Sequence, residues 1–215
     1  MSIRVDILSI GALAKNLVWN ETTARRSQHT TCTLIRSGKR IIIVDPGLPA
    51  PALAARIFER TGLTPASITD VFLTHVSNDS VAGLELFENA RWFCSAPELE
   101  VISGRARNDG DASHLHALIE KLREMPDSLE TGIDLYPLPG FSHGTAGLLI
   151  GSPVTTTLIT GPAVASLDHF LAGQVLPDCV NINAAKESLQ EVYEIADAIV
   201  PGYDNLFQNP RAFGL

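Results

Sequence analysis

The 215-residue sequence is poor in cysteine and in basic residues, and it contains no long hydrophobic run. Its three cysteines lie far apart, lack C-x-x-C spacing and are odd in number, which argues against a disulfide framework and against a structural zinc module. We therefore expect buried free thiols at Cys32, Cys94 and Cys179. The 16 basic residues are outnumbered by 24 acidic ones, so the net charge is −8 and we expect no nucleic-acid-binding surface.

Targeting and membrane-spanning signals are also missing. The N-terminal residues do not form a basic segment followed by an unbroken apolar core, and no apolar run reaches the roughly 18 residues of a spanning helix. We therefore expect a cytoplasmic protein that does not enter a membrane. Hydrophobic residues make up 45% of the chain, enough for a large core, and no long flexible linker interrupts it. The sequence predicts one domain over residues 1–215.

The order of predicted elements is typical of an α/β protein, because strands occur in two groups that are each followed by helices. The predicted strands are 3–10, 30–36, 40–44, 68–73, 91–94, 133–138, 148–150, 155–160 and 198–200. The predicted helices are 50–60, 97–102, 115–122 and 184–198. The polar segment 103–116 is interpreted as a surface loop.

The most informative stretch is 69–83, T-D-V-F-L-T-H-V-S-N-D-S-V-A-G. An apolar, β-branched run of strand length leads into a short polar segment that contains His75, Ser77, Asp79 and Ser80. The apolar spacing that follows indicates a short helix, with Asp79 or Ser80 as its N-cap. A strand end beside a helix start is where α/β proteins place functional side chains, so these four residues are the candidate catalytic residues.

This stretch resembles the signature of the metallo-β-lactamase fold superfamily, T-H-x-H-x-D-H followed by a small residue and glycine. Four further segments match the family's framing residues in the right order: D-P-G at 45–47, P-G-F-S-H-G at 139–144, L-I-T-G-P at 158–162 and V-P-G-Y at 200–203. The resemblance covers about residues 30–204. It implies a four-layer αββα sandwich of two mixed β-sheets with helices on the outer faces. It also implies that Asp45 ties down the loops beneath the metal site.

The resemblance implies seven metal-ligand positions, and only two of them keep a ligating residue type. The seven positions are occupied by His75, Ser77, Asp79, Ser80, Phe141, Pro162 and Tyr203. Zinc requires three or four nitrogen, sulfur or oxygen donors, and phenylalanine and proline supply none. Without a metal the attacking water keeps a pKa of about 15 instead of about 7, which closes the family's usual hydrolytic route. We therefore expect no metal or other cofactor.

Three interpretations of this site stay open. The first is a degenerate metal site in a non-catalytic or ligand-binding relative of the family's hydrolases. In the second, His143 joins His75 and Asp79 to hold zinc or another divalent metal, which would give an ester or thioester hydrolase with an atypical mononuclear site. The third is metal-free nucleophilic catalysis by Ser77 or Ser80, with His75 as the base and Asp79 orienting it.

The loops that carry these positions predict a ligand pocket whichever interpretation holds. Replacement of polar ligands by Phe141, Pro162 and Tyr203 makes the pocket less charged and more aromatic, which favours a small apolar or amphipathic ligand. The simpler alternative is that His75 is a hydrogen-bonded histidine at a strand end and Asp79 a helix N-cap. The predicted pocket residues are Asp45, His75, Ser77, Asp79, Ser80, Phe141, His143, Pro162 and Tyr203.

Overall fold

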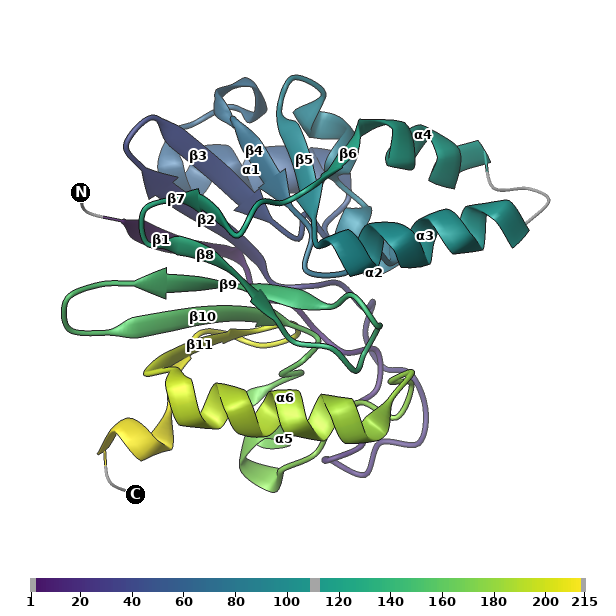
Figure 1. Ribbon diagram of the computed structural model, residues 1–215, viewed down its shortest axis with the longest axis vertical. Coiled ribbons are helices and arrows are strands. Elements are labelled where there is room, and N and C mark those ends of the chain that lie inside the picture. The colour runs from purple at the N-terminus through teal and green to yellow at the C-terminus, as the bar shows by residue number, and fades with distance from the viewer. Residues whose placement is uncertain (1–2, 109–112, 214–215) are drawn as a thin grey trace.

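The computed structural model describes residues 3–108 and 113–213, and it consists of two six-stranded sheets packed face to face with helices on both outer sides (Figure 1). The first sheet contains β1 (Arg4–Ser9), β2 (Cys32–Ser37), β3 (Arg40–Val44), β4 (Asp70–Phe72), β5 (Arg91–Cys94) and β6 (Leu122–Glu124) in that order. The second contains β12 (Phe207–Gln208), β11 (Ala198–Pro201), β10 (Thr156–Gly161), β9 (Ala146–Gly151), β8 (Ile133–Pro137) and β7 (Ser128–Glu130). The predicted αββα sandwich is confirmed.

Both sheets are mixed. Strands β3 to β6 pair in parallel, whereas β1, β2 and β3 pair antiparallel. In the second sheet β10 and β11 are parallel and the other pairs are antiparallel. The helices are α1 (Ala50–Thr61), α2 (Asn78–Val81), α3 (Ala96–Asn108), α4 (Ser113–Lys121), α5 (Leu167–Ala172) and α6 (Ile182–Ile195), with short 3-10 turns η1 (Pro65–Ser67), η2 (Leu84–Phe87) and η3 (Pro210–Phe213).

Alternation of apolar side chains explains how one strand serves two cores. In β3, Ile42 and Val44 face the second sheet, while Ile43 faces the helices that cover the first. Leu53 and Ile57 of α1 pack on that outer face. Helices α5 and α6 cover the second sheet in the same way, as Figure 1 shows. Because both faces of the central strands are buried, the sequence of these strands reads as nearly continuous apolar runs.

The segment interpreted as a surface loop at 103–116 is the main error in the predicted elements. Helix α3 continues to Asn108 and α4 begins at Ser113, so most of the described part of this segment is helical. Ile102 and Ala106 are buried one helical turn apart, and their burial extends the helix beyond the predicted end at 102. Strands β6, β7 and β12 and helix α5 were not predicted, because elements of two to six residues carry little periodicity.

Two of the three cysteines follow the prediction of buried free thiols. Cys32 and Cys94 are buried, and Cys179 is half-buried; all three are free. Within the described residues, no helix combines the length and apolar character needed to span a membrane.

Candidate functional site

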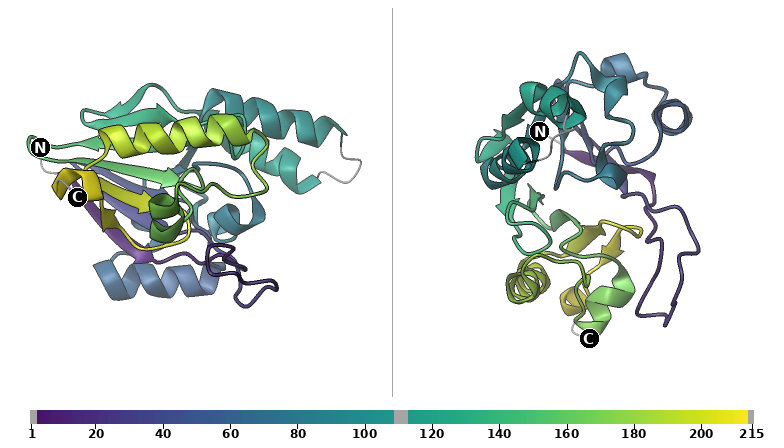
Figure 2. Two further views of the ribbon diagram at one scale, coloured as in Figure 1. Left: turned by 90° about the horizontal axis from the view of Figure 1, so that it is seen from below. Right: turned by 90° about the vertical axis from the view of Figure 1, so that its right-hand side faces the viewer.

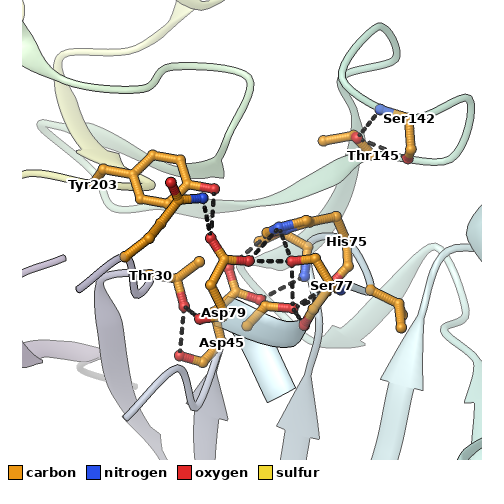
Figure 3. A network of polar contacts seen from close by, with 12 residues as sticks. Thr30, Asp45, His75, Ser77, Asp79, Ser142, Thr145 and Tyr203 are labelled. Atoms are coloured by element: carbon orange, nitrogen blue, oxygen red, sulfur yellow. Dashed lines mark hydrogen bonds and ion pairs between the residues drawn. The ribbon is translucent and has the colours of Figure 1, made fainter. Parts of the chain in front are cut away.

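The site lies where the parallel strands β3 and β4 end side by side. Strand pairing sets Val44 of β3 opposite Phe72 of β4, so the residues that follow each strand emerge at the same edge of the sheet. Asp45 follows β3 directly, and Thr74 and His75 follow β4. Figure 3 shows Asp45 and His75 converging with Ser77, Asp79 and Tyr203 in one polar network, and Thr74 hydrogen-bonds to both Asp45 and His75.

Asp45 supports the loop after β4, as the resemblance implies. Its side chain is 1% exposed; Oδ1 lies 2.9 Å from the backbone nitrogen of Thr74 and Oδ2 lies 2.6 Å from Thr74 Oγ1. Burial raises the pKa of Asp45 to about 7, although the hydrogen bonds from Thr74 oppose that rise. Asp45 also has a positive φ of 49°, a conformation that aspartate tolerates better than most residues.

His75 lies between two hydroxyl groups. Its Nδ1 is 3.0 Å from Thr74 Oγ1 and its Nε2 is 2.8 Å from Ser77 Oγ. Burial lowers the pKa of His75 to about 4, more than the nearby Asp79 carboxylate raises it. The imidazole is therefore neutral at neutral pH.

Asp79 is the ionised end of the network. Ser77 Oγ contacts its Oδ1, while Gln28 Nε2 and Tyr203 Oη donate to its Oδ2 at 2.7 and 3.0 Å. Burial disfavours the charged form, but the hydrogen bonds from Ser77 and Gln28 outweigh it and keep the pKa of Asp79 below its usual range. Its Oδ1 is 3.9 Å from His75 Nε2, beyond hydrogen-bonding distance.

Counting protons fixes a consistent state for this chain of contacts. If Ser77 donates its only hydroxyl proton to ionised Asp79, His75 Nε2 must donate to Ser77 Oγ. Nδ1 of the neutral ring is then an acceptor that faces Thr74 Oγ1, and Thr74 Oγ1 also donates to Asp45 Oδ2, so the hydroxyl of Thr74 links the two groups. The network is thus satisfied by protein groups without a cation.

Residues from the second sheet's loops complete the network. Phe141 packs edge-on against the His75 ring, with centroids 5.2 Å apart and planes at 87°. Tyr203 is 5% exposed, and burial together with the Asp79 carboxylate raises its pKa, so the phenol keeps its proton and donates to Asp79. Pro162 is buried. These three residues occupy positions at which the resemblance implied metal ligands.

The structure does not bring His143 to His75 and Asp79. His143 is exposed, because the preceding Ser142 is anchored to buried Glu98 through Oγ and to Thr145 Oγ1 through its backbone nitrogen, at 2.9 Å. In residues 3–108 and 113–213, no group of three or more histidine, cysteine, aspartate or glutamate side chains is placed to hold a metal. The zinc that the fold family implies therefore does not fit the residues of this site.

The two serines have different environments. Ser80 is buried, and its Oγ donates to the carbonyl of His75 at 3.0 Å and accepts from the Ser77 backbone nitrogen at 3.1 Å, so it faces the backbone instead of the imidazole. Ser77 makes the contact with His75 Nε2 that the nucleophile hypothesis requires. Asp79 hydrogen-bonds to Ser77 and lies 3.9 Å from His75 Nε2, whereas Thr74 Oγ1 lies at His75 Nδ1, the nitrogen at which the acid of a catalytic triad orients the imidazole. The N-cap of α2 is Ser77, not the predicted Asp79 or Ser80.

The glycines of the framing motifs are explained by close backbone packing. A Cβ atom on Gly161, whose φ is +53°, would lie 2.1 Å from Thr74 Oγ1, and one on Gly202 would lie 2.8 Å from the carbonyl carbon of Gly161. The loops after β4, β10 and β11 can therefore meet only if these positions lack side chains. This requirement does not depend on a metal, so the frames are needed even where the ligands are absent.

Sequence reasoning missed two residues of the site and the loop that covers it. Gln28 comes from the long segment between β1 and β2, which Figure 2 shows running along one side of both halves of the molecule. Glu98, in the first turn of α3, is 1% exposed and accepts from the Val76 backbone nitrogen at 2.8 Å. Neither Gln28 nor Glu98 lies in a sequence motif that predicts a role at the site.

Residues of the segment between β1 and β2 line an open cavity beside the network. This cavity has a volume of about 410 Å³, and Gln28, the donor to Asp79, forms part of its wall. Its apolar lining includes Leu13, Leu17, Leu176 and Pro177, and its polar lining includes Lys15, His169 and Asp178. Of the predicted pocket residues, Ser77 lines a second cavity and Tyr203 a smaller third one.

Comparison with known proteins gives a consistent family. Residues 26–202 match the family model described as the metallo-beta-lactamase superfamily. A metallo-beta-lactamase-like protein from Thermotoga maritima is 19% identical and has a TM-score of 0.73, with 97% of this chain and 100% of that chain covered. A probable metal-dependent hydrolase from Staphylococcus aureus is 18% identical with a TM-score of 0.69, covering 95% and 89%. An N-acyl homoserine lactone hydrolase with N-hexanoyl-L-homoserine bound at its catalytic metal center is 18% identical with a TM-score of 0.64, covering 89% and 87%.

Proposed function

The chain belongs to the metallo-β-lactamase superfamily, and from that premise we propose that it is a ligand-binding member with a degenerate metal site that does not perform metal-dependent hydrolysis. The observation that carries the proposal is the closed network at the former metal position. Every polar side chain from Asp45 to Tyr203 in this network has a protein partner. A metal would have to displace these partners and would find too few ligands.

The charges of the network support the same conclusion. An intact dinuclear site needs cations because several histidines and carboxylates share one small volume. Here His75 is neutral, and the Asp79 carboxylate accepts hydrogen bonds from Ser77, Gln28 and Tyr203. Three donors compensate a single negative charge without a metal.

We place the ligand in the 410 Å³ cavity beside Gln28. Its volume lies within the roughly 300–1,000 Å³ of small-molecule sites. Leu13, Leu17 and Leu176 suit an apolar chain, and Lys15 and Gln28 suit a polar head group. Fold relatives hold N-hexanoyl-L-homoserine and N-decanoyl-L-homoserine, which are molecules of this amphipathic kind. A small amphipathic molecule is therefore the proposed ligand.

Metal analysis and ligand-induced stabilisation test the proposal together. Protein purified without chelators should contain well under one equivalent of zinc, iron or manganese, and close to two tightly held metals would overturn the proposal. N-decanoyl-L-homoserine at about 100 times its dissociation constant should stabilise the fold by about 2.7 kcal/mol, visible as a raised melting temperature. Leu17→Asp, in the cavity wall, should abolish the shift, whereas Leu171→Asp, an exposed leucine on α5, should keep it.

A further inference from the structure

A separate cavity of about 480 Å³ lies between the α2–η2 segment and the α3–α4 helix pair, and Ser77 is at its edge. Its apolar wall is formed by Val76, Val81, Leu84, Trp92 and Leu118. Leu84 and Trp92 are buried, and Leu118 packs against the same core cluster. The floor of this cavity is therefore part of the hydrophobic core and keeps its shape without a ligand.

Two cations are fixed on the helix-pair side of the cavity. Lys121 Nζ lies 5.0 Å from the centre of the Trp92 ring, and Arg105 Nη1 lies 3.3 Å from the carbonyl oxygen of Val76. Within the described residues, neither cation forms an ion pair with an acidic side chain. Both can therefore accept an anionic group at the mouth of an apolar cavity.

Two glutamates line the opposite side, and they differ from the cations in how they are held. Glu85 and Glu88 are exposed, and within the described part of the chain neither carboxylate has a hydrogen bond or an ion pair. Arg105 and Lys121 are exposed as well, and Arg105 interacts electrostatically with buried Glu98. The two cations nevertheless contact the cavity wall, at Val76 and Trp92, whereas the carboxylates of Glu85 and Glu88 form no contact of this kind.

We propose that this cavity binds an amphipathic carboxylate of medium chain length, with its chain against Trp92 and Leu118 and its carboxylate at Arg105 and Lys121. The apolar wall supplies the area that a chain buries, and the cations select the charge of the head group. This site does not depend on the degenerate metal site or on the cavity beside Gln28. The two proposals can therefore fail separately.

The chain has two tryptophans, and they report on different cavities. Trp92 lines the cavity proposed here, while Trp19 lines the small cavity beside Tyr203. The Trp19→Phe variant therefore leaves Trp92 as the only tryptophan, and Trp92→Phe leaves Trp19. Decanoate should give a saturable fluorescence change in Trp19→Phe, and a signal confined to Trp92→Phe would overturn the proposal.

Variants in the Trp19→Phe background test where the probe lies. Ala117→Phe fills the cavity wall and should weaken decanoate binding by about tenfold or more, while Ala55→Phe adds the same side chain at an exposed site on α1 and should not change it. Melting temperatures show that each variant is folded. Equal affinity in the two variants would overturn the site.

Charge variants test the head group. Replacing Arg105 and Lys121 together by glutamine should weaken decanoate about fivefold and leave decanol unchanged, because partly exposed charge pairs contribute modestly. Glu85→Gln should strengthen decanoate or leave it unchanged. A preference for decylammonium over decanoate would reverse the assigned charge and overturn the proposal.

Discussion

The two halves of the site differ in chemistry. The loop from the first sheet keeps polar residues, His75, Ser77 and Asp79, whereas the loops from the second sheet carry Phe141, Pro162 and Tyr203. The loops of the two sheets contact each other at two places, and in each the charge state of one residue suits the residue that it contacts. Neutral His75 is covered by the apolar ring of Phe141, and ionised Asp79 accepts a hydrogen bond from Tyr203.

This difference shows how the polar groups of the site are satisfied by protein partners. Removing a metal from an intact site leaves buried groups that are charged or unpaired, which costs several kcal/mol for each ion. Here each polar group that remains on the first-sheet side has a partner suited to its charge, and the second-sheet side supplies two of these partners.

The largest expected effect is a gain of zinc binding when histidine is introduced both in the loop of the first sheet and in a loop of the second sheet. Ser77→His combined with Phe141→His would place three imidazoles around the position between His75, residue 77 and residue 141. Three nitrogen donors are the minimum that a catalytic zinc site uses. We expect about one equivalent of zinc in the double variant by elemental analysis, and well under one in each single variant.

Ser77→His alone should fail because Phe141 still occupies the side from which the third donor must come. The matched control is Ser77→His with Phe58→His, which adds the same number of histidines but puts one on the exposed face of α1. Tight zinc binding by the control or by either single variant would show that the contact between the two halves does not decide metal binding.

The same comparison explains what could be predicted from sequence. The framing motifs predicted the sandwich and the meeting of Asp45, His75, Asp79 and Tyr203 at one place, because close backbone packing requires the glycines of these frames. Strand ends and turns are local features, and local residue patterns encode them well.

What could not be predicted depends on contacts between segments far apart in the chain. Gln28 and its partner Asp79 are 51 positions apart in the sequence, and Ser142 and its partner Glu98 are 44 positions apart. No short motif predicts either pair. The second contact anchors the backbone just before His143, which is exposed. The sequence alone left open a metal site made of His75, Asp79 and His143, because the contact between Ser142 and Glu98 cannot be predicted from the sequence.

The second-largest expected effect is a loss of stability on replacement of Asp45, which hydrogen-bonds to Thr74 in the loop after β4. Asp45→Ala leaves the Thr74 backbone nitrogen and hydroxyl without their buried partner and puts alanine at positive φ, so we expect a loss of about 2–4 kcal/mol of unfolding free energy. Asp45→Asn resembles the protonated acid in shape and tolerates the same φ. At pH 4.5 it should lie within about 1 kcal/mol of wild type in urea unfolding.

The pH dependence of that comparison has a definite sign. A folded pKa of about 7, above the unfolded value of about 4, means that the stabilising contribution of Asp45 is complete below pH 4 and is lost as pH rises toward 7. The loss is at most about 1.4 kcal/mol per pH unit. Asparagine does not titrate. The unfolding free energy of Asp45→Asn should therefore rise relative to that of wild type between pH 4.5 and 7.5. If the variant instead becomes relatively weaker, Asp45 is ionised in the folded protein.

The smallest expected effect is that of chelation, for which we predict no change. In a metal-dependent fold, EDTA removes a ligand that binds only the native state, and the melting temperature falls. Here Ser77, Gln28 and Tyr203 already compensate Asp79, and Phe141 covers His75, so excess EDTA should leave the melting temperature within error. A fall of several degrees that zinc reverses would show a structural metal. The His143→Ala variant would then test where that metal binds. If the variant no longer shows the zinc-reversible fall in melting temperature, His143 must move from its exposed position to a metal site with His75 and Asp79.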